Sequence, residues 1–135
     1  GTYAAPDELY AFADVLGRHG AGVFESASRI GEGERDDADV PKTRAELAWM
    51  GEVSRRSGRP VSFGLTQHDS RPDLYQKVIG FAKEENARGA LLRPQTTARS
   101  VGVLFSIDTR TPFDRSPAWR SEGGGHAQGW RRARA

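Results

Sequence analysis

The sequence predicts an α/β fold built from three helix-then-strand units between residue 6 and about residue 93. Segments with helical apolar spacing alternate with short apolar runs that end in polar residues, a pattern typical of a parallel sheet with right-handed crossovers. The chain has 135 residues and opens at Gly1 without a methionine. A closed (β/α)₈ barrel needs roughly 250 residues. We therefore expect a slice of a larger β/α protein.

The first helix is predicted to start at Pro6, where a proline followed by two acids favours a helix N-terminus. Gly17 and Gly20 are expected to end it. Residues 21–24 then form a predicted short, buried strand, with the polar residue Glu25 at its end.

The second helix is predicted to begin at Thr43, because Glu46 follows three residues later and completes a capping box. The Ser-Gly-Arg-Pro run at residues 57–60 is expected to end it. Residues 61–65 form the next predicted strand, which leads into Gln67.

The third helix is expected to take Asp69 or Ser70 as its cap, with Pro72 in its first turn. Residues 90–92 form the third predicted strand. Residues 101–105 read as a fourth strand or as an apolar lead into a helix, and residues 109–120 as an ordered loop.

The composition separates a folded part from a basic tail. Residues 115–135 hold five Arg against one Glu, so the other residues carry −2 of the total net charge of +2. We expect residues 121–135 to be a disordered tail and residues 1–120 to be the folded part. A basic surface confined to a tail argues against a nucleic-acid partner.

Function in parallel sheets lies at the carboxyl ends of the strands. That rule selects five candidate substrate-binding residues: Glu25, Gln67, His68, Arg93 and Gln95. The chain lacks cysteine and shows no GxSxG elbow, phosphate loop or dinucleotide fingerprint.

Several readings of these candidates stay open. Glu25 either takes part in function or pairs with Arg29 or Arg93. Arg93 could instead bind a substrate carboxylate through two parallel hydrogen bonds. His68 is a general base, a metal ligand or a loop histidine. The acidic segment at residues 31–40 reads as a solvated loop, since it lacks the spacing of a calcium loop.

The chain resembles the N-acyl-D-amino-acid deacylases of the metal-dependent amidohydrolase superfamily. The similar segments are GTYA at 1–4 with DEL at 7–9, HGAGVFE at 19–25, RPVSF at 59–63, RPQ at 93–95, RSVG at 99–102, TPF at 111–113 and PAWR at 117–120. The resemblance implies a partial (β/α)₈ TIM barrel of about three to four parallel βα units.

The resemblance also implies a hydrolase of the amide bond of N-acyl amino acids or related compounds, with zinc or another divalent metal activating water. The family has histidines after its middle strands, where this chain has Glu25 and Gln67, and His68 is displaced from the second place. We therefore assign no metal ligand to this chain and expect it to be inactive by itself.

The alternative is a non-catalytic α/β binding or structural module, in which Glu25, Gln67 and Arg93 satisfy one another. In either case we expect a cytoplasmic protein with a small-molecule ligand and no membrane partner, because cysteine and long apolar runs are absent. Open sheet edges would favour low stability and self-association.

Overall fold

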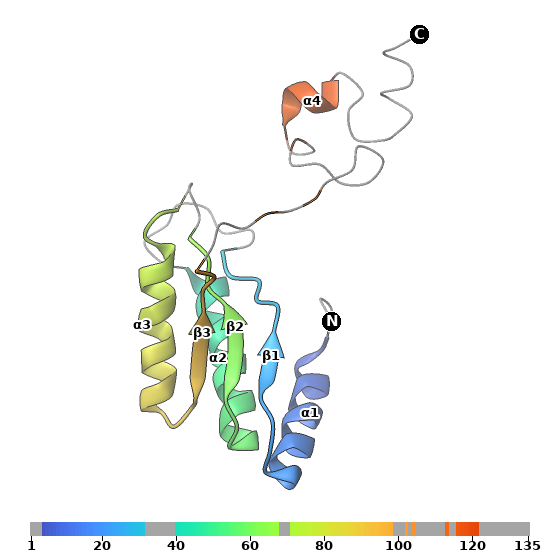
Figure 1. The fold of residues 1–135 in the computed structure, drawn as a ribbon, viewed down its shortest axis with the longest axis vertical. Coiled ribbons are helices and arrows are strands. Elements are labelled where there is room, and N and C mark those ends of the chain that lie inside the picture. The colour runs from blue at the N-terminus through green and yellow to red at the C-terminus, as the bar shows by residue number, and fades with distance from the viewer. Residues whose placement is uncertain are drawn as a thin grey trace. The chain divides into compact units, whose positions relative to one another are not determined.

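Helices and strands alternate through the first 98 residues. The computed structural model describes residues 4–31, 40–67, 71–98, 102, 104, 113 and 116–121. The chain divides into one unit of residues 1–98 and a second of residues 99–135, and each is described by itself. The elements of the first unit are α1 (Pro6–His19), β1 (Phe24–Ser26), α2 (Pro41–Ser57), β2 (Val61–Gly64), α3 (Leu74–Ala87) and β3 (Leu92–Gln95) (Figure 1).

The three strands form one parallel sheet in the order β1-β2-β3. Because strands that follow one another in sequence are also neighbours in the sheet, right-handed crossovers bring their helices to the same face. α2 contacts β2 and β3, α3 contacts β3, and both α1 and α3 pack on α2. The strands lie in front of α2 in Figure 1. The predicted α/β class with a parallel sheet is confirmed.

The core lies between the sheet and these helices. Alternate strand residues point toward the helices, and Val61, Phe63 and Leu92 are buried there. They pack with the buried side chains of α2 and α3, which include Leu47, Met50, Val53 and Val78. Fully burying one large apolar side chain contributes about 1.5–3 kcal/mol, so this layer is the main stabilising contact of the unit.

Gly20 ends α1 as predicted, but the expectation that Gly17 also ends it is wrong. Gly20 has a φ of 64° and donates its N–H to the carbonyl of Leu16 at 2.9 Å. Gly17 lies inside the helix, where an added Cβ would be 3.3 Å from the carbonyl oxygen of Arg56. The missing side chain at Gly17 therefore allows α1 to approach α2 closely.

The predicted capping box at the start of the second helix is wrong. α2 begins earlier, at Pro41, and has no side-chain cap. Thr43 Oγ1 instead accepts a hydrogen bond from the N–H of Gly31 at 3.1 Å, and Glu46 Oε1 accepts one from the N–H of Arg29 at 3.0 Å. The two side chains bind the loop that follows β1, so they hold that loop against α2.

β1 and β3 both begin later than predicted from the apolar runs at 21–24 and 90–92. Gly22 has a φ of 97° and Gly89 a φ of 93°. These values lie outside the extended region. The chain therefore enters β1 only beyond Gly22. Gly89 precedes the predicted run at 90–92, so its conformation does not account for the later start of β3.

The outer edge of β3 is closed by a side chain of α3. The carbonyl of Leu91 accepts from the N–H of Val61, so the alternation of a parallel ladder turns Leu92 and Pro94 outward. Asn86 Oδ1 accepts from the N–H of Leu92 at 2.7 Å, and Asn86 Nδ2 donates to the carbonyl of Leu92 at 3.2 Å. Pro94 has no N–H to offer. A further strand would meet few free groups here.

A carboxylate of α3 joins α3 to α2. The side chain of Glu85 is 7% exposed and accepts from Arg55 Nη1 at 2.7 Å and from Arg88 Nη1 at 2.8 Å. The hydrogen bond to Glu85 raises the pKa of the Arg55 guanidinium above its ordinary value. Gly51 lies against this pair, with no room for a side chain.

The start of the third helix differs from its prediction. α3 begins at Leu74, so Pro72 precedes the helix rather than lying in its first turn. The predicted caps Asp69 and Ser70 lie outside the described residues.

The second unit contains α4 (Pro117–Ser121), which begins inside the segment 109–120. The prediction of a loop is therefore wrong for residues 117–120. The rings of Phe113 and Trp119 lie 5.7 Å apart. Most of the predicted fourth strand at 101–105, and the tail beyond Ser121, lie outside the described residues. None of the described helices is long and apolar enough to cross a bilayer.

Candidate functional site

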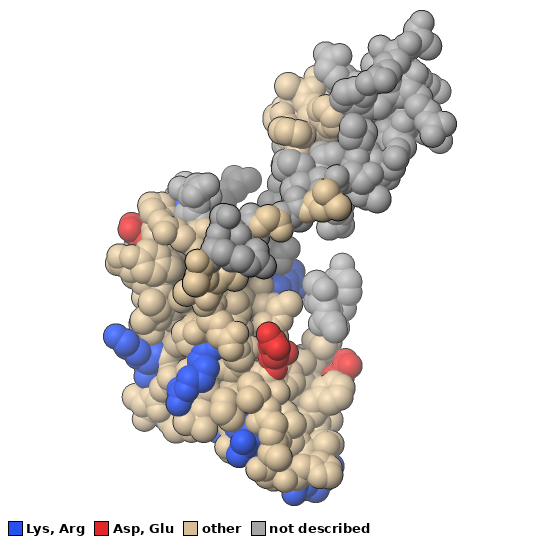
Figure 2. Space-filling model, viewed as in Figure 1, with Lys and Arg blue, Asp and Glu red and all other residues tan. Residues whose placement is uncertain are grey.

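Three polar side chains form a row across the face of the sheet that the helices leave open. Glu25 of β1 lies opposite Ser62 of β2, and Ser62 lies opposite Arg93 of β3. Two strand spacings separate Glu25 from Arg93, which places their Cα atoms about 10 Å apart. Figure 2 shows acidic and basic side chains separated by uncharged surface on this side of the molecule. β1 and β3 also end later than predicted, and this brings both charged candidates into the sheet.

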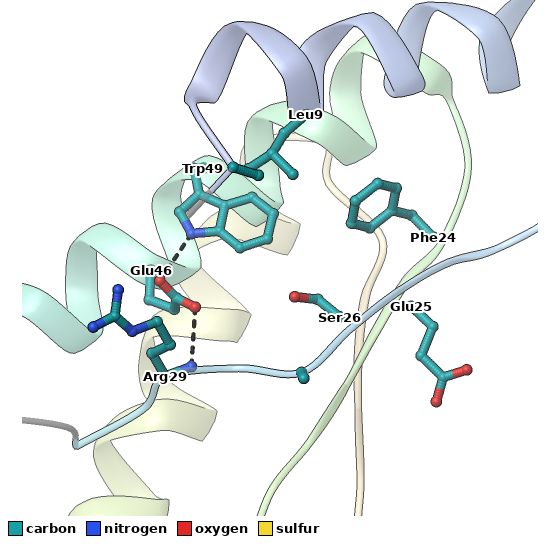
Figure 3. Close-up of a pocket in the computed structure, with 9 residues that line it drawn as sticks. Leu9, Phe24, Glu25, Ser26, Arg29, Glu46 and Trp49 are labelled. Atoms are coloured by element: carbon teal, nitrogen blue, oxygen red, sulfur yellow. Dashed lines mark hydrogen bonds between the residues drawn. The ribbon is translucent and has the colours of Figure 1, made fainter. Parts of the chain in front are cut away.

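The carboxylate of Glu25 has no hydrogen-bond or ion-pair partner among the described residues. Glu25 is exposed. Arg29 lies on the side of Glu46, away from Glu25 (Figure 3). Arg93 directs Nη1 to the carbonyl oxygen of its neighbour Leu92, at 3.1 Å. The described residues thus show neither of the pairs that would make Glu25 purely structural.

The remaining candidates are spread along the same edge. Gln95 ends β3 opposite Gly64, one row further than Arg93, and its side chain is exposed. Gln67 is exposed and lies beyond the end of β2. His68 lies outside the described residues. The structure therefore brings together Glu25, Arg93 and Gln95, and leaves Gln67 apart from the row.

Ser62 is a site residue that the sequence reasoning missed. Its side chain is 4% exposed, and its Oγ has no hydrogen-bond partner among the described residues. A buried hydroxyl without a partner is costly. The available signal was the polar residue between Val61 and Phe63, since alternation places that residue on the face opposite the apolar core.

A pocket of about 400 Å³ lies beside β1. Its apolar wall is formed by Leu9 of α1, Phe24 of β1 and Trp49 of α2 (Figure 3). The rings of Phe24 and Trp49 meet edge to face, with centroids 6.4 Å apart. Glu46 Oε2 accepts from Trp49 Nε1 at 2.9 Å while its other oxygen holds the N–H of Arg29.

The loop after β1 is fixed at several points, so the pocket has firm walls. Ser28 Oγ donates to the carbonyl of Gly64 at 3.1 Å, in addition to the bonds at Arg29 and Gly31. The sequence signal for this pocket was the Glu46–Trp49 spacing of three on one helix, which places both side chains on one face. The capping-box prediction paired Glu46 with Thr43 instead, and the pocket was missed.

A divalent metal, which the family resemblance implies, does not fit the described residues. No group of three or more His, Cys, Asp or Glu side chains converges in the part of the chain that the structure describes. A zinc site needs three or four such ligands. We therefore assign no chemical step to a metal bound by this chain.

Comparison with known proteins gives no relative. No protein-family model, no curated protein and no solved structure matches the chain.

Proposed function

We propose that this chain is one side of a β/α barrel hydrolase that acts on the amide bond of N-acyl amino acids. The observation that carries the proposal is the order of the strands together with the side of the sheet on which the helices lie. Parallel strands in sequential order with their helices on one face are the arrangement of a (β/α)₈ wall, in which the open face lines the barrel interior. The resemblance of the strand segments supports the same parent fold.

Within this proposal, the chain contributes substrate binding. Arg93 is exposed and has guanidinium donors beyond the one it directs to Leu92. A guanidinium binds a carboxylate through two parallel, charge-assisted hydrogen bonds. Glu25 lies across Ser62 on the same face, where its carboxylate can accept from the amide N–H of the same small molecule. An N-acyl amino acid carries both groups.

We assign no catalytic step to the described residues. In such an enzyme, a divalent metal would supply the activated water, and its ligands would have to come from other residues. The lack of cysteine fits the cytoplasmic location that the proposal includes.

The experiment is a titration of the ¹⁵N-labelled chain with N-acetyl-D-leucine, followed by amide chemical shifts. The amides of β1, β2 and β3 should shift, and the Arg93→Gln variant should bind about tenfold more weakly, because a charge-assisted hydrogen bond is worth about 1.5–3 kcal/mol. The carboxamide analogue of the ligand should show the same loss.

Arg18→Gln is the matched control, since Arg18 lies in the last turn of α1, away from the open sheet face. It should bind as the unchanged chain does. Equal binding of acid and carboxamide, or no effect of Arg93→Gln, would contradict the proposal.

A second candidate is a non-catalytic α/β binding module. The observation that favours it is the closed edge of β3, since a barrel continued beyond β3 would have to displace Asn86 from Leu92. Metal-dependent hydrolysis by the chain, or stoichiometric metal bound to it, would exclude this candidate.

A further inference from the structure

The two edges of the sheet are not equivalent. Asn86 and Pro94 close the outer edge of β3, but no side chain among the described residues makes a hydrogen bond to the outer edge of β1. The N–H of Phe24 donates to the carbonyl of Pro60 at 2.9 Å, which places Phe24 on the β2 side of β1. The backbone N–H and C=O of Glu25 therefore face outward. Neither makes a hydrogen bond to a described residue.

We propose that the outer edge of β1 binds an extended peptide segment of a partner protein, with the alternation apolar–basic–apolar. This proposal rests on the second candidate, the binding module, since in a barrel a neighbouring strand would pair with this edge. Addition of a strand to an open edge supplies backbone hydrogen bonds, and pockets for alternate side chains supply specificity. The edge at Glu25 and the adjoining pocket provide these two elements.

The alternation follows from the two sides of β1. Glu25 also lines the pocket, but its side chain extends away from Leu9 and Trp49, while Phe24 points toward them (Figure 3). In an added strand, the residue beside Glu25 would share the open face with that unpartnered carboxylate, so a Lys or Arg is favoured there. The peptide residues before and after this Lys or Arg would point to the helix side, where the apolar wall of the pocket lies.

A second copy of this chain is a poorer occupant than such a peptide. Pairing of β1 with β1 of another copy about a two-fold axis would set Glu25 against Glu25, and like charges directly opposite are destabilising. Pairing of β1 with β3 of another copy would require Asn86 to release Leu92.

The test is a titration of the ¹⁵N-labelled chain with a blocked synthetic peptide centred on Val-Lys-Val. We expect shifts of the Glu25 amide and the Trp49 indole. A peptide centred on Val-Glu-Val should bind about tenfold more weakly, and Glu25→Lys should reverse that preference, because each change turns an attractive pair into a repulsive one. Asp14→Lys on α1 makes the same charge change away from the edge and should leave the preference intact.

Backbone pairing is tested with two methylated Val-Lys-Val peptides. One is N-methylated at its central residue, whose N–H would bond to Glu25 in antiparallel pairing, and the other at the following residue, whose N–H would do so in parallel pairing. One of the two should not bind. Equal binding of both methylated peptides and the unmethylated peptide, or a preference that Glu25→Lys leaves unchanged, would overturn the proposal. So would a concentration-dependent dimer that blocks the peptide, since a second copy would then cover the edge. Arg93 takes no part in this contact, so Arg93→Gln should bind the peptide normally, whatever the outcome of the N-acetyl-D-leucine titration.

Discussion

Gly51 and Gly80 are both helical glycines, but their surroundings differ. A Cβ at Gly51 would overlap with Glu85 Oε2 and would lie 3.1 Å from Arg55 Nη1, whereas a Cβ at Gly80 would meet nothing within 4 Å. The carboxylate of Glu85 is almost fully buried and held by two guanidinium groups, so it has little freedom to move. The glycine at residue 51 is therefore a consequence of the ion pair between α2 and α3.

Gly51→Ala should destabilise the chain by about 1–3 kcal/mol, because the added methyl group displaces Glu85 from Arg55. Alanine normally improves a helix interior by up to about 1 kcal/mol over glycine, so the steric effect must exceed that gain. Urea unfolding, followed by circular dichroism at the helical band, measures the free energy of unfolding.

Gly80→Ala is the control, since it makes the same substitution in α3 without a steric conflict. It should stabilise the chain by up to about 1 kcal/mol. If both variants gained stability, the buried Glu85 would have to be far more mobile than its two ion pairs allow.

At the scale of the elements, the side chain of Asn86 makes the hydrogen bonds to β3 that a further strand would otherwise make. Its amide group donates to and accepts from Leu92 as a neighbouring backbone would. Such side-chain closure is one of the ways in which proteins protect an edge strand from pairing with another chain.

Asn86→Ala should cost about 1–2 kcal/mol and should increase self-association, because the N–H of Leu92 loses its partner and the carbonyl of Leu92 keeps only the hydrogen bond from Arg93. Alanine is the better helix former, so a loss of stability would come from the missing hydrogen bonds. Sedimentation velocity over a range of concentrations measures the association. Gln76→Ala removes an exposed side-chain amide that donates a hydrogen bond to Tyr75 and should leave the chain monomeric. Monomeric Asn86→Ala at every concentration would contradict the protective role.

The kinds of elements and their order were predictable, because each depends on local patterns such as the helical spacing of α1 and the apolar run of β2. The first and last residues of the strands were less predictable. Glu25 and Pro94 look like strand ends by composition, but both lie inside a strand. The conformation of Gly22 delays the start of β1. A sheet edge tolerates Pro94.

The candidate site was predictable only as a set of strand ends. The rule for parallel sheets placed Glu25 and Arg93 on the same edge, and the register of the strands places them in one row with Ser62. The pocket beside β1 was missed because it depends on contacts between α1, β1 and α2. The Glu46–Trp49 spacing on α2 indicates only one wall of the pocket, and no spacing within one segment indicates the contacts with α1 and β1.

At the scale of the whole molecule, the described core is confined to the first unit. Every buried apolar side chain among the described residues lies between Ala13 and Leu92. The residues after Ala98 belong to the second unit. A chain that ends at Ala98 should therefore have the same urea midpoint as the full chain. Its free energy of unfolding should agree within about 0.5 kcal/mol, the usual effect of changes away from a core.

The comparison needs both chains at equal concentration, with circular dichroism as the readout. Loss of cooperative unfolding in the shorter chain would show that residues 99–135 supply part of the packing. An unchanged midpoint would assign the stability to the sheet and its three helices.

The closed edge of β3 also sets the composition of any assembly built on this sheet. Head-to-tail association joins unlike surfaces and propagates into filaments when both surfaces are available. A molecule bound at β1 here would find no second acceptor at the far side, because Asn86 already occupies it. Strand addition should therefore stop at one partner per molecule, whatever the concentration.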